Sequence, residues 1–239
     1  MSFTTWTPRA VSSEARHWQG AVWRMVEAQH TASTMKIVDS RDEQDVLEWL
    51  LEGSKPAPPK AAEALDYLLA TPFRYDPRRG GSRFRAATDP GVFYGAQSVR
   101  TAGAELGYWR WKFLKDAPAL ERLEPVAHTA FRADVSTPAV DLRHAPFDVD
   151  AGIWTRPDDY SGTQRFAQVA REAAIGGIVY RSVRDPEPAW CIALLTPTVF
   201  AKPRPRPEMQ TWWLAVQADA AIWRRSSQAM TFAMTAWSR

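Results

Sequence analysis

The stretch GGSRFRAATDPGVFYGAQSVRTAGAELGYWRWKF, residues 80–113, decides how this chain folds. It begins with a turn rich in glycine and arginine, residues 80–85, which leads into a short apolar strand at residues 92–94. Ser98 then precedes a helix that begins near Val99, and serine is a preferred residue at this capping position. The stretch therefore predicts a turn, a strand and a helix in direct succession.

Glu105 is the informative residue of this helix. Its neighbours at i−3, i+3 and i+4 are Ala102, Tyr108 and Trp109, so the carboxylate lies on a small and aromatic face. Burying a charge is unfavourable unless the charge is paired or functional. The spacing leaves two interpretations open: a surface ion pair with Lys112 or an arginine, or a carboxylate that is kept for function.

Length and composition suit one compact domain. The chain has 239 residues, of which 45% are hydrophobic and 24% charged, enough apolar material for a sizeable core. We expect a single domain over residues 1–239, with a polar N-terminal arm at residues 1–19 and a helical insertion at about residues 40–70. The single cysteine, Cys191, lies in an apolar run and is interpreted as a buried structural thiol. One cysteine allows no disulfide within the chain, which fits a reducing cytoplasm.

Charge and hydropathy argue against several classes of partner. Arginine outnumbers lysine 24 to 6, and arginine is the better side chain for bidentate contacts with carboxylates or phosphates. The net charge of +3 is too small to indicate nucleic acid, but it is compatible with a small anionic ligand. No apolar run is long enough to span a bilayer, and the N-terminus lacks the apolar segment of a signal peptide. We therefore expect a cytoplasmic protein without membrane contact.

The first part of the chain predicts a strand and two helices. Residues 20–27 alternate as a strand, with Arg24 on the same face as Val22 and Val26. Such an arginine either bonds a carboxylate or phosphate or, on an edge strand, extends to water, and the pattern leaves both open. Two helices follow as a predicted hairpin: residues 42–53, with Val46, Leu47, Leu50 and Leu51 as the apolar stripe, and residues 60–70, with Ala64, Leu65, Leu68 and Leu69 inward.

The second half is predicted to be rich in strands. Residues 177–183 form a strand that places Ser182 on the same face as Ile178 and Tyr180, and the apolar run at residues 190–195 suits a central strand. The other predicted elements are strands at 126–135 and 139–142, a loop at 145–157, a helix from Ser161 or Thr163 through Ala174, and a hairpin of 211–217 and 221–225.

Standard catalytic motifs are absent from the sequence. It has no P-loop, GxGxxG, HExxH or CxxC, and its four histidines are scattered, so no metal is expected. Four residues stand in unusual local settings: Arg24, Tyr94, Glu105 and Ser182. Such a set suits a reaction in which positive charge develops at a sugar carbon, because an arginine can hold a phosphate and a carboxylate can stabilise the cation. Spacing alone does not separate this interpretation from coincidence.

Five short segments form a recognisable pattern: WRMV (23–26), GGSRFR (80–85), VFYGAQS (92–98), AELGYWR (104–110) and IVYRSVR (178–184). Together they resemble the RES-domain family, and the resemblance spans nearly the whole chain. It implies an α+β fold with a twisted, split β-sheet core, as in ADP-ribosyltransferases and diphtheria-type toxins. It also implies an NAD+-consuming toxin that acts by hydrolysis, by phosphorolysis or by ADP-ribose transfer to a protein. The implied partner is an Xre-like or ParS/MbcA-type antitoxin.

The resemblance also implies roles for individual residues. The family arginine falls on Arg24, with Arg74 as a rival because the predicted insertion separates the first strand from the glycine-rich turn. The glutamate falls on Glu105 and the serine on Ser182, so Arg24, Glu105 and Ser182 are the expected catalytic residues. NAD+ is expected as a substrate, with no cofactor and with inorganic phosphate as one of the candidate acceptors. The residues expected to bind NAD+ are Tyr94, Arg83 and Arg74.

Two other classes of function stay open at this point. One is a catalytically idle RES-like fold that only binds a partner, for which added nucleotide should leave the melting temperature unchanged. The other is a module for single-stranded nucleic acid that uses arginines and tryptophans and binds in a salt-dependent way. The lack of a concentrated basic stripe counts against the second. The acceptor and the oligomeric state do not follow from the sequence, and a homo-oligomer stays open.

Overall fold

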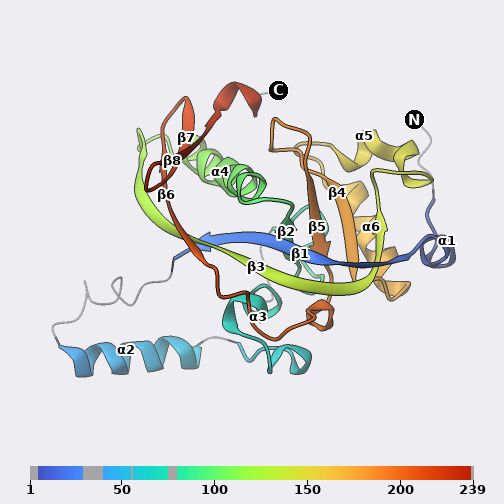
Figure 1. Cartoon of the computed structure of the whole chain (residues 1–239), viewed down its shortest axis with the longest axis horizontal. Helices are drawn as coiled ribbons and strands as arrows, with labels where there is room; N and C mark the ends of the chain where they lie inside the picture. The colour runs from blue at the N-terminus through green and yellow to red at the C-terminus, as the bar shows by residue number, and fades with distance from the viewer. Residues whose placement is uncertain (1–4, 29–39, 55, 75–79, 238–239) are drawn as a thin grey trace.

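The structure, a computed structural model, describes residues 5–28, 40–54, 56–74 and 80–237. Helices flank one large, twisted, eight-stranded sheet (Figure 1). This arrangement confirms the mixed α+β class expected from the sequence. No helix within these described ranges combines the length and the apolar character needed to cross a membrane.

The sheet folds back on itself. In sheet order, its strands are β1 (Arg16–Glu27), β2 (Phe93–Ala96), β5 (Trp190–Leu194), β4 (Gly177–Arg181), β3 (Leu123–Asp141), β6 (Gln210–Val216), β7 (Ala220–Arg225) and β8 (Gln228–Ala233). β1 also pairs antiparallel with β3 along its whole length, from Arg16 opposite Ala139 to Glu27 opposite His128. The pairings therefore lead from β1 through β2, β5, β4 and β3 back to β1, and β6, β7 and β8 extend from β3.

β3 is a single 19-residue strand, whereas the sequence predicted two strands at residues 126–135 and 139–142. Pro138, which has no N–H to donate, lies opposite His17 of β1. Its carbonyl accepts a hydrogen bond of 3.0 Å from the Gly176 N–H. Pairing with β1 thus keeps the strand continuous through the proline.

Both faces of the sheet are covered by apolar side chains. Adjacent residues such as Phe93 and Tyr94 contribute to two different hydrophobic clusters, as alternation along a strand requires. β8 was not predicted; it turns the expected C-terminal hairpin into three antiparallel strands. Its alternate residues Met230 and Phe232 pack toward the core while their neighbours are exposed.

α4 (Val99–Asp116) begins where the sequence predicted. Ser98 caps it, because its Oγ accepts a hydrogen bond of 3.1 Å from the Thr101 N–H. The helix approaches β7 through small residues: Trp223 donates from Nε1 to the Gly103 carbonyl at 3.2 Å. A Cβ at Gly103 would lie 3.3 Å from that Nε1, so glycine permits this close approach.

The other helices are α1 (Pro8–Ser13), α2 (Arg41–Ser54), α3 (Tyr67–Arg74), α5 (Ala151–Trp154) and α6 (Ser161–Glu172), with 3-10 turns at Lys60–Ala62, Phe147–Asp150, Pro197–Val199 and Met234–Ala236. α6 covers most of the predicted helix, but neither Ser161 nor Thr163 caps its first turn as predicted. Instead, Asp159 Oδ1 accepts hydrogen bonds from the Ser161 N–H at 3.0 Å and from its Oγ at 2.7 Å. The predicted loop at 145–157 is largely helical turns, because buried Trp154 donates from Nε1 to the Phe147 carbonyl at 2.7 Å.

The expected arm at residues 1–19 is wrong for its described part. Residues from 8 onward form α1 and the start of β1. Val11 is fully buried in the core, and Trp6 donates from Nε1 to Asp150 Oδ2 at 2.9 Å. These contacts hold the start of the chain against the rest of the fold.

In its described residues, the insertion contains the first predicted helix, but this helix does not pack as the expected hairpin. The apolar stripe of α2 is largely exposed, and Trp49 beside it is 74% exposed (Figure 1 shows α2 away from the sheet). The second helix, α3, begins only at Tyr67. Asp66 Oδ1 accepts a hydrogen bond of 2.9 Å from the Leu68 N–H and so caps the start of the helix. Leu68 and Leu69 are buried as predicted, but Ala64 is exposed.

Candidate active site

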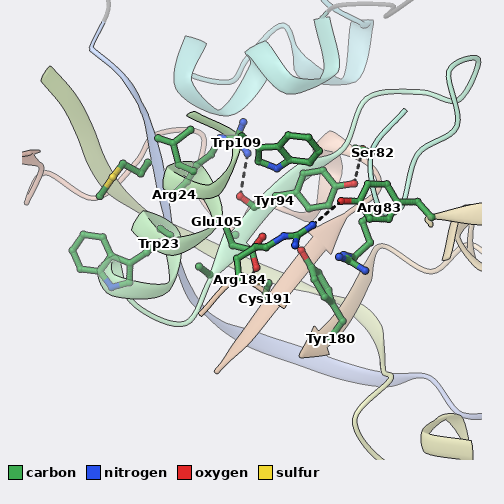
Figure 2. Close-up of a pocket in the computed structure, with 16 residues that line it drawn as sticks. Trp23, Arg24, Ser82, Arg83, Tyr94, Glu105, Trp109, Tyr180, Arg184 and Cys191 are labelled. Atoms are coloured by element: carbon green, nitrogen blue, oxygen red, sulfur yellow. Dashed lines mark hydrogen bonds between the residues drawn. The ribbon is translucent and has the colours of Figure 1, made fainter. Parts of the chain in front are cut away.

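A cavity of about 210 Å³ lies where β1, β2, α4 and the end of β4 meet (Figure 2). Its apolar walls include Trp23, Leu106 and Trp109. The charged residues that line it are Arg24, Arg83, Arg184 and Glu105. Most of the residues singled out in the sequence therefore meet in one place, although they come from separate elements.

Glu105 is held by Ser182. The Ser182 Oγ donates a hydrogen bond of 2.6 Å to Glu105 Oε1, and the Cys191 Sγ lies 3.8 Å from the same oxygen. The alternative ion pair with Lys112 is wrong, because Lys112 Nζ pairs with Asp116 at 3.0 Å. Within the described ranges Glu105 forms no ion pair, so its half-buried carboxylate faces the cavity without a protein counterion.

Ser182 occupies a buried turn directly after β4. It is 5% exposed, and its Oγ also accepts hydrogen bonds from the N–H of Asp185 at 3.1 Å and, more weakly, of Arg184 at 3.4 Å. Thr101 of α4 donates to Asp185 Oδ2 at 3.0 Å, which joins this turn to the helix that carries Glu105. The serine hydroxyl thus orients the carboxylate and stabilises the turn at the same time.

Tyr94 connects β2 to the glycine-rich turn. Its hydroxyl accepts a hydrogen bond of 3.0 Å from the Phe84 N–H and lies 2.7 Å from the Ser82 Oγ. Burial raises the pKa of Tyr94, so the hydroxyl stays protonated. The tyrosine therefore fixes the turn against the cavity and adds an aromatic wall.

Arg24 lines the cavity from β1. Its Nη1 donates to the Tyr94 carbonyl at 3.0 Å, and its guanidinium carbon lies 4.6 Å from the centroid of the Phe93 ring. Burial lowers the pKa of Arg24 to about 10, which leaves it charged at neutral pH. The edge-strand alternative is wrong, because β1 pairs with β2 on one side and with β3 on the other.

The other two expected arginines lie in different settings. Arg83 lines the cavity, but its Nη1 donates to the carbonyls of Trp154 at 3.0 Å and Arg156 at 2.8 Å. Arg74 stands at the end of α3, where its Nε donates to the Pro56 carbonyl at 2.5 Å. The structure brings Arg24, Arg83, Tyr94 and Glu105 together around the cavity and leaves Arg74 outside its lining.

Arg184 and Tyr160 line the cavity but were not singled out from the sequence. Arg184 follows Ser182 by two positions, and this spacing is the one local signal that could have indicated it. Burial raises the pKa of Tyr180, another lining residue, well above its ordinary value and keeps it neutral. No group of three or more histidine, cysteine, aspartate or glutamate side chains able to hold a metal occurs in the ranges that the structure covers.

Comparisons with known proteins place the chain in a family. No curated protein is similar enough to the sequence to count as a match. The crystal structure of the M. tuberculosis MbcT–MbcA toxin–antitoxin complex contains a chain that aligns with a TM-score of 0.43 and 14% identity, covering 93% of this chain and 89% of that chain. The model of the RES domain matches residues 57–217, well over half of the sequence. The chain therefore belongs to the RES-domain family.

Proposed function

We propose that this RES-domain protein degrades NAD+ by cleaving the bond between nicotinamide and its ribose. The observation that carries the proposal is the half-buried Glu105 carboxylate, which Ser182 holds at the wall of a cavity lined by arginines and tyrosines. A fixed carboxylate without a counterion can stabilise positive charge that develops on a bound sugar.

In this mechanism the nicotinamide lies near Tyr94, and the phosphates lie near Arg24 and Arg83. Glu105 accepts hydrogen bonds from the hydroxyls of the nicotinamide ribose and stabilises the cationic transition state. The carbon–nitrogen bond breaks, and nicotinamide leaves with the electron pair. An oxygen of water or inorganic phosphate then bonds to the anomeric carbon, its proton passes to solvent, and the product is ADP-ribose or its phosphate. A protein side chain as acceptor would instead give an ADP-ribosylated protein.

The same proposal covers the biological role. NAD+ loss is harmful to a cell, so an enzyme of this kind acts as a toxin and needs a partner that restrains it. We assign it a cognate antitoxin of the Xre or MbcA type, on the strength of the family resemblance. Co-expression tests this role: the chain alone should arrest growth in a way that depends on Glu105, and the gene for its antitoxin should relieve the arrest.

Turnover by purified protein tests the chemistry directly. NAD+ is incubated with the protein with and without inorganic phosphate, and nicotinamide and the ribose product are separated and measured. Glu105→Gln keeps the size of the side chain and should lower the rate about 100- to 1,000-fold. Glu121→Gln makes the same chemical change at an exposed position after α4 and should leave the rate unchanged.

The outcomes separate the possible reactions. NAD+ loss that needs phosphate identifies a phosphorylase, and loss without phosphate identifies a hydrolase. Labelled ADP-ribose that appears on protein identifies a transferase. A Glu105→Gln variant that melts like the wild type and consumes NAD+ at the wild-type rate would sink the proposal.

A further inference from the structure

Arg184 carries a buried charge without a protein counterion. It is 3% exposed, and its guanidinium carbon lies 3.4 Å from the centroid of the Tyr108 ring. Its Nη2 donates to the Tyr160 hydroxyl at 3.3 Å and to the Pro157 carbonyl. Among the residues placed by the structure, no carboxylate forms an ion pair with it. Because an uncompensated buried charge is unfavourable, this environment points to an anionic ligand.

Arg184 has N–H groups that no acceptor in the described part of the chain uses. A guanidinium has five N–H donors, and the hydrogen bonds of this side chain use only Nη2. Nε and Nη1 have no acceptor in the part of the chain that is described. Since Arg184 lines the same cavity as Glu105 (Figure 2), these donors are available to a bound ligand.

Tyr160 ties Arg184 to Arg83. The Arg83 guanidinium carbon lies 4.7 Å from the centroid of the Tyr160 ring, while Arg184 donates to the hydroxyl of the same residue. Together with Arg24, these side chains bring three guanidiniums to the cavity lining, against the single carboxylate of Glu105. The resulting formal charge of +2 matches the two negative charges of a diphosphate ester.

The position of Arg184 is coupled to that of Glu105. Both belong to one network, because the Ser182 Oγ donates to Glu105 and accepts from the N–H groups of the turn that carries Arg184. At the other side, Trp237 donates from Nε1 to the Arg184 carbonyl at 2.7 Å. An anion held by Arg184 therefore lies at a fixed place relative to the carboxylate.

We propose that Arg184, positioned by Tyr108 and Tyr160, binds the diphosphate group of the ligand and shares it with Arg83. The inference deepens the proposed function and rests on it for the identity of the ligand, a dinucleotide whose diphosphate links the two nucleosides. Arg184 thus sets where the scissile ribose lies relative to Glu105.

Binding of inorganic pyrophosphate and of ADP-ribose, measured by titration calorimetry, tests the inference without turnover. Arg184→Met should weaken both affinities about 10- to 100-fold, since it removes charge-assisted hydrogen bonds. Arg184→Lys retains the positive charge but lacks the planar guanidinium. Its two affinities should therefore lie between those of Arg184→Met and the wild type. Arg181→Met is the matched control, because Arg181 is exposed at the end of β4, three positions earlier, and should bind like the wild type. Melting curves check that each variant folds, and Arg184→Lys keeps the test valid if Arg184→Met does not fold.

The result separates this inference from the proposed function. If the wild type binds neither anion, or if folded Arg184 variants bind both as tightly as the wild type, the inference is overturned. NAD+ turnover that is unchanged in the Arg184 variants would overturn it while leaving the enzymatic proposal standing. Arg184-dependent binding of pyrophosphate in a protein that never consumes NAD+ would support the inference and refute the enzymatic proposal.

Discussion

The Oγ of Ser182 lies 2.6 Å from Oε1 of Glu105, although the two residues stand 77 positions apart in the chain. A hydrogen bond from a hydroxyl to a carboxylate at this distance is short and charge-assisted. It occupies one oxygen of Glu105 and fixes the direction of the other. In the proposed mechanism the serine therefore acts through the carboxylate rather than through the substrate.

Replacement of Ser182 by alanine should affect activity and stability together. We expect kcat to fall about 10- to 100-fold because the carboxylate loses its orienting partner. The free energy of unfolding should fall by about 1–3 kcal/mol, because the buried N–H groups of Arg184 and Asp185 lose the hydroxyl that accepts their hydrogen bonds. NAD+ turnover and urea unfolding measure the two effects. Ser136→Ala, which removes a hydroxyl that contacts His17 on β1, should change neither by much.

Replacement of Tyr94 by phenylalanine should mainly loosen the glycine-rich turn. The variant keeps the ring but leaves the Phe84 N–H without the hydroxyl that accepts its hydrogen bond. We expect a loss of about 1–2 kcal/mol in the free energy of unfolding, with an unchanged dependence on denaturant. Tyr67→Phe, at a position that is 60% exposed, should lower the free energy of unfolding by less than about 0.5 kcal/mol. Equal stability of Tyr94→Phe and the wild type would contradict this role.

Paired variants separate the two rival arginines. Arg24→Met should lower kcat/KM about 10- to 100-fold, because Arg24 lines the cavity and donates to the Tyr94 carbonyl. Arg74→Met should leave kcat/KM within about twofold, because Arg74 lies outside the cavity lining. The opposite order would assign the family arginine to Arg74 despite its place at the end of α3.

Acid should destabilise the protein through His128. Burial lowers the pKa of His128 to about 4, while its Nδ1 lies 2.9 Å from the Val126 carbonyl. The unfolded chain takes up a proton on this side chain near pH 6.5, but the folded chain does so only near its lowered pKa. Between pH 6.5 and about 4 the unfolded state therefore binds more protons than the folded state. The free energy of unfolding falls as the pH drops through this range, by up to about 3 kcal/mol.

A variant that cannot titrate isolates this contribution. Relative to the wild type, His128→Phe should gain stability as the pH falls from 6.5 to 4, measured as the free energy of unfolding at each pH. His144→Gln, at an exposed site, should show no comparable gain. A constant difference between wild type and His128→Phe across the window would rule out His128 as the cause.

Local structure follows from the sequence where neighbouring residues determine it. Ser98 lies beside the helix it caps, and the face that carries Glu105 follows from helical spacing. The continuity of β3 through Pro138 could not be predicted, because it depends on pairing with β1 from the other end of the chain. The start of α3 depends likewise on Asp66, whose N–H donates to the Pro203 carbonyl.

The candidate site likewise combines features that neighbouring residues indicate with features that depend on distant contacts. Glu105 and Ser182 stood out from their local settings and from the family resemblance, but their hydrogen bond exists only in the folded chain. The sequence favoured Arg24 over Arg74 as the family arginine, but both follow an aromatic residue in an apolar segment, and only the folded chain shows that Arg24 lines the cavity and Arg74 does not. Arg184 lies beyond the end of a strand, where alternation no longer indicates which way a side chain points.

The closed circuit of strands also sets when the fold can first be completed during synthesis. Synthesis proceeds from the N-terminus, so Arg24 leaves the ribosome before residues 128–139 of β3, and β1 cannot pair with β3 until those residues emerge. Glu105 lacks its partner until Ser182 emerges, and the turn after Ser182 lacks the hydrogen bond from Trp237 until that residue emerges as well. A nascent or truncated chain therefore lacks a complete cavity.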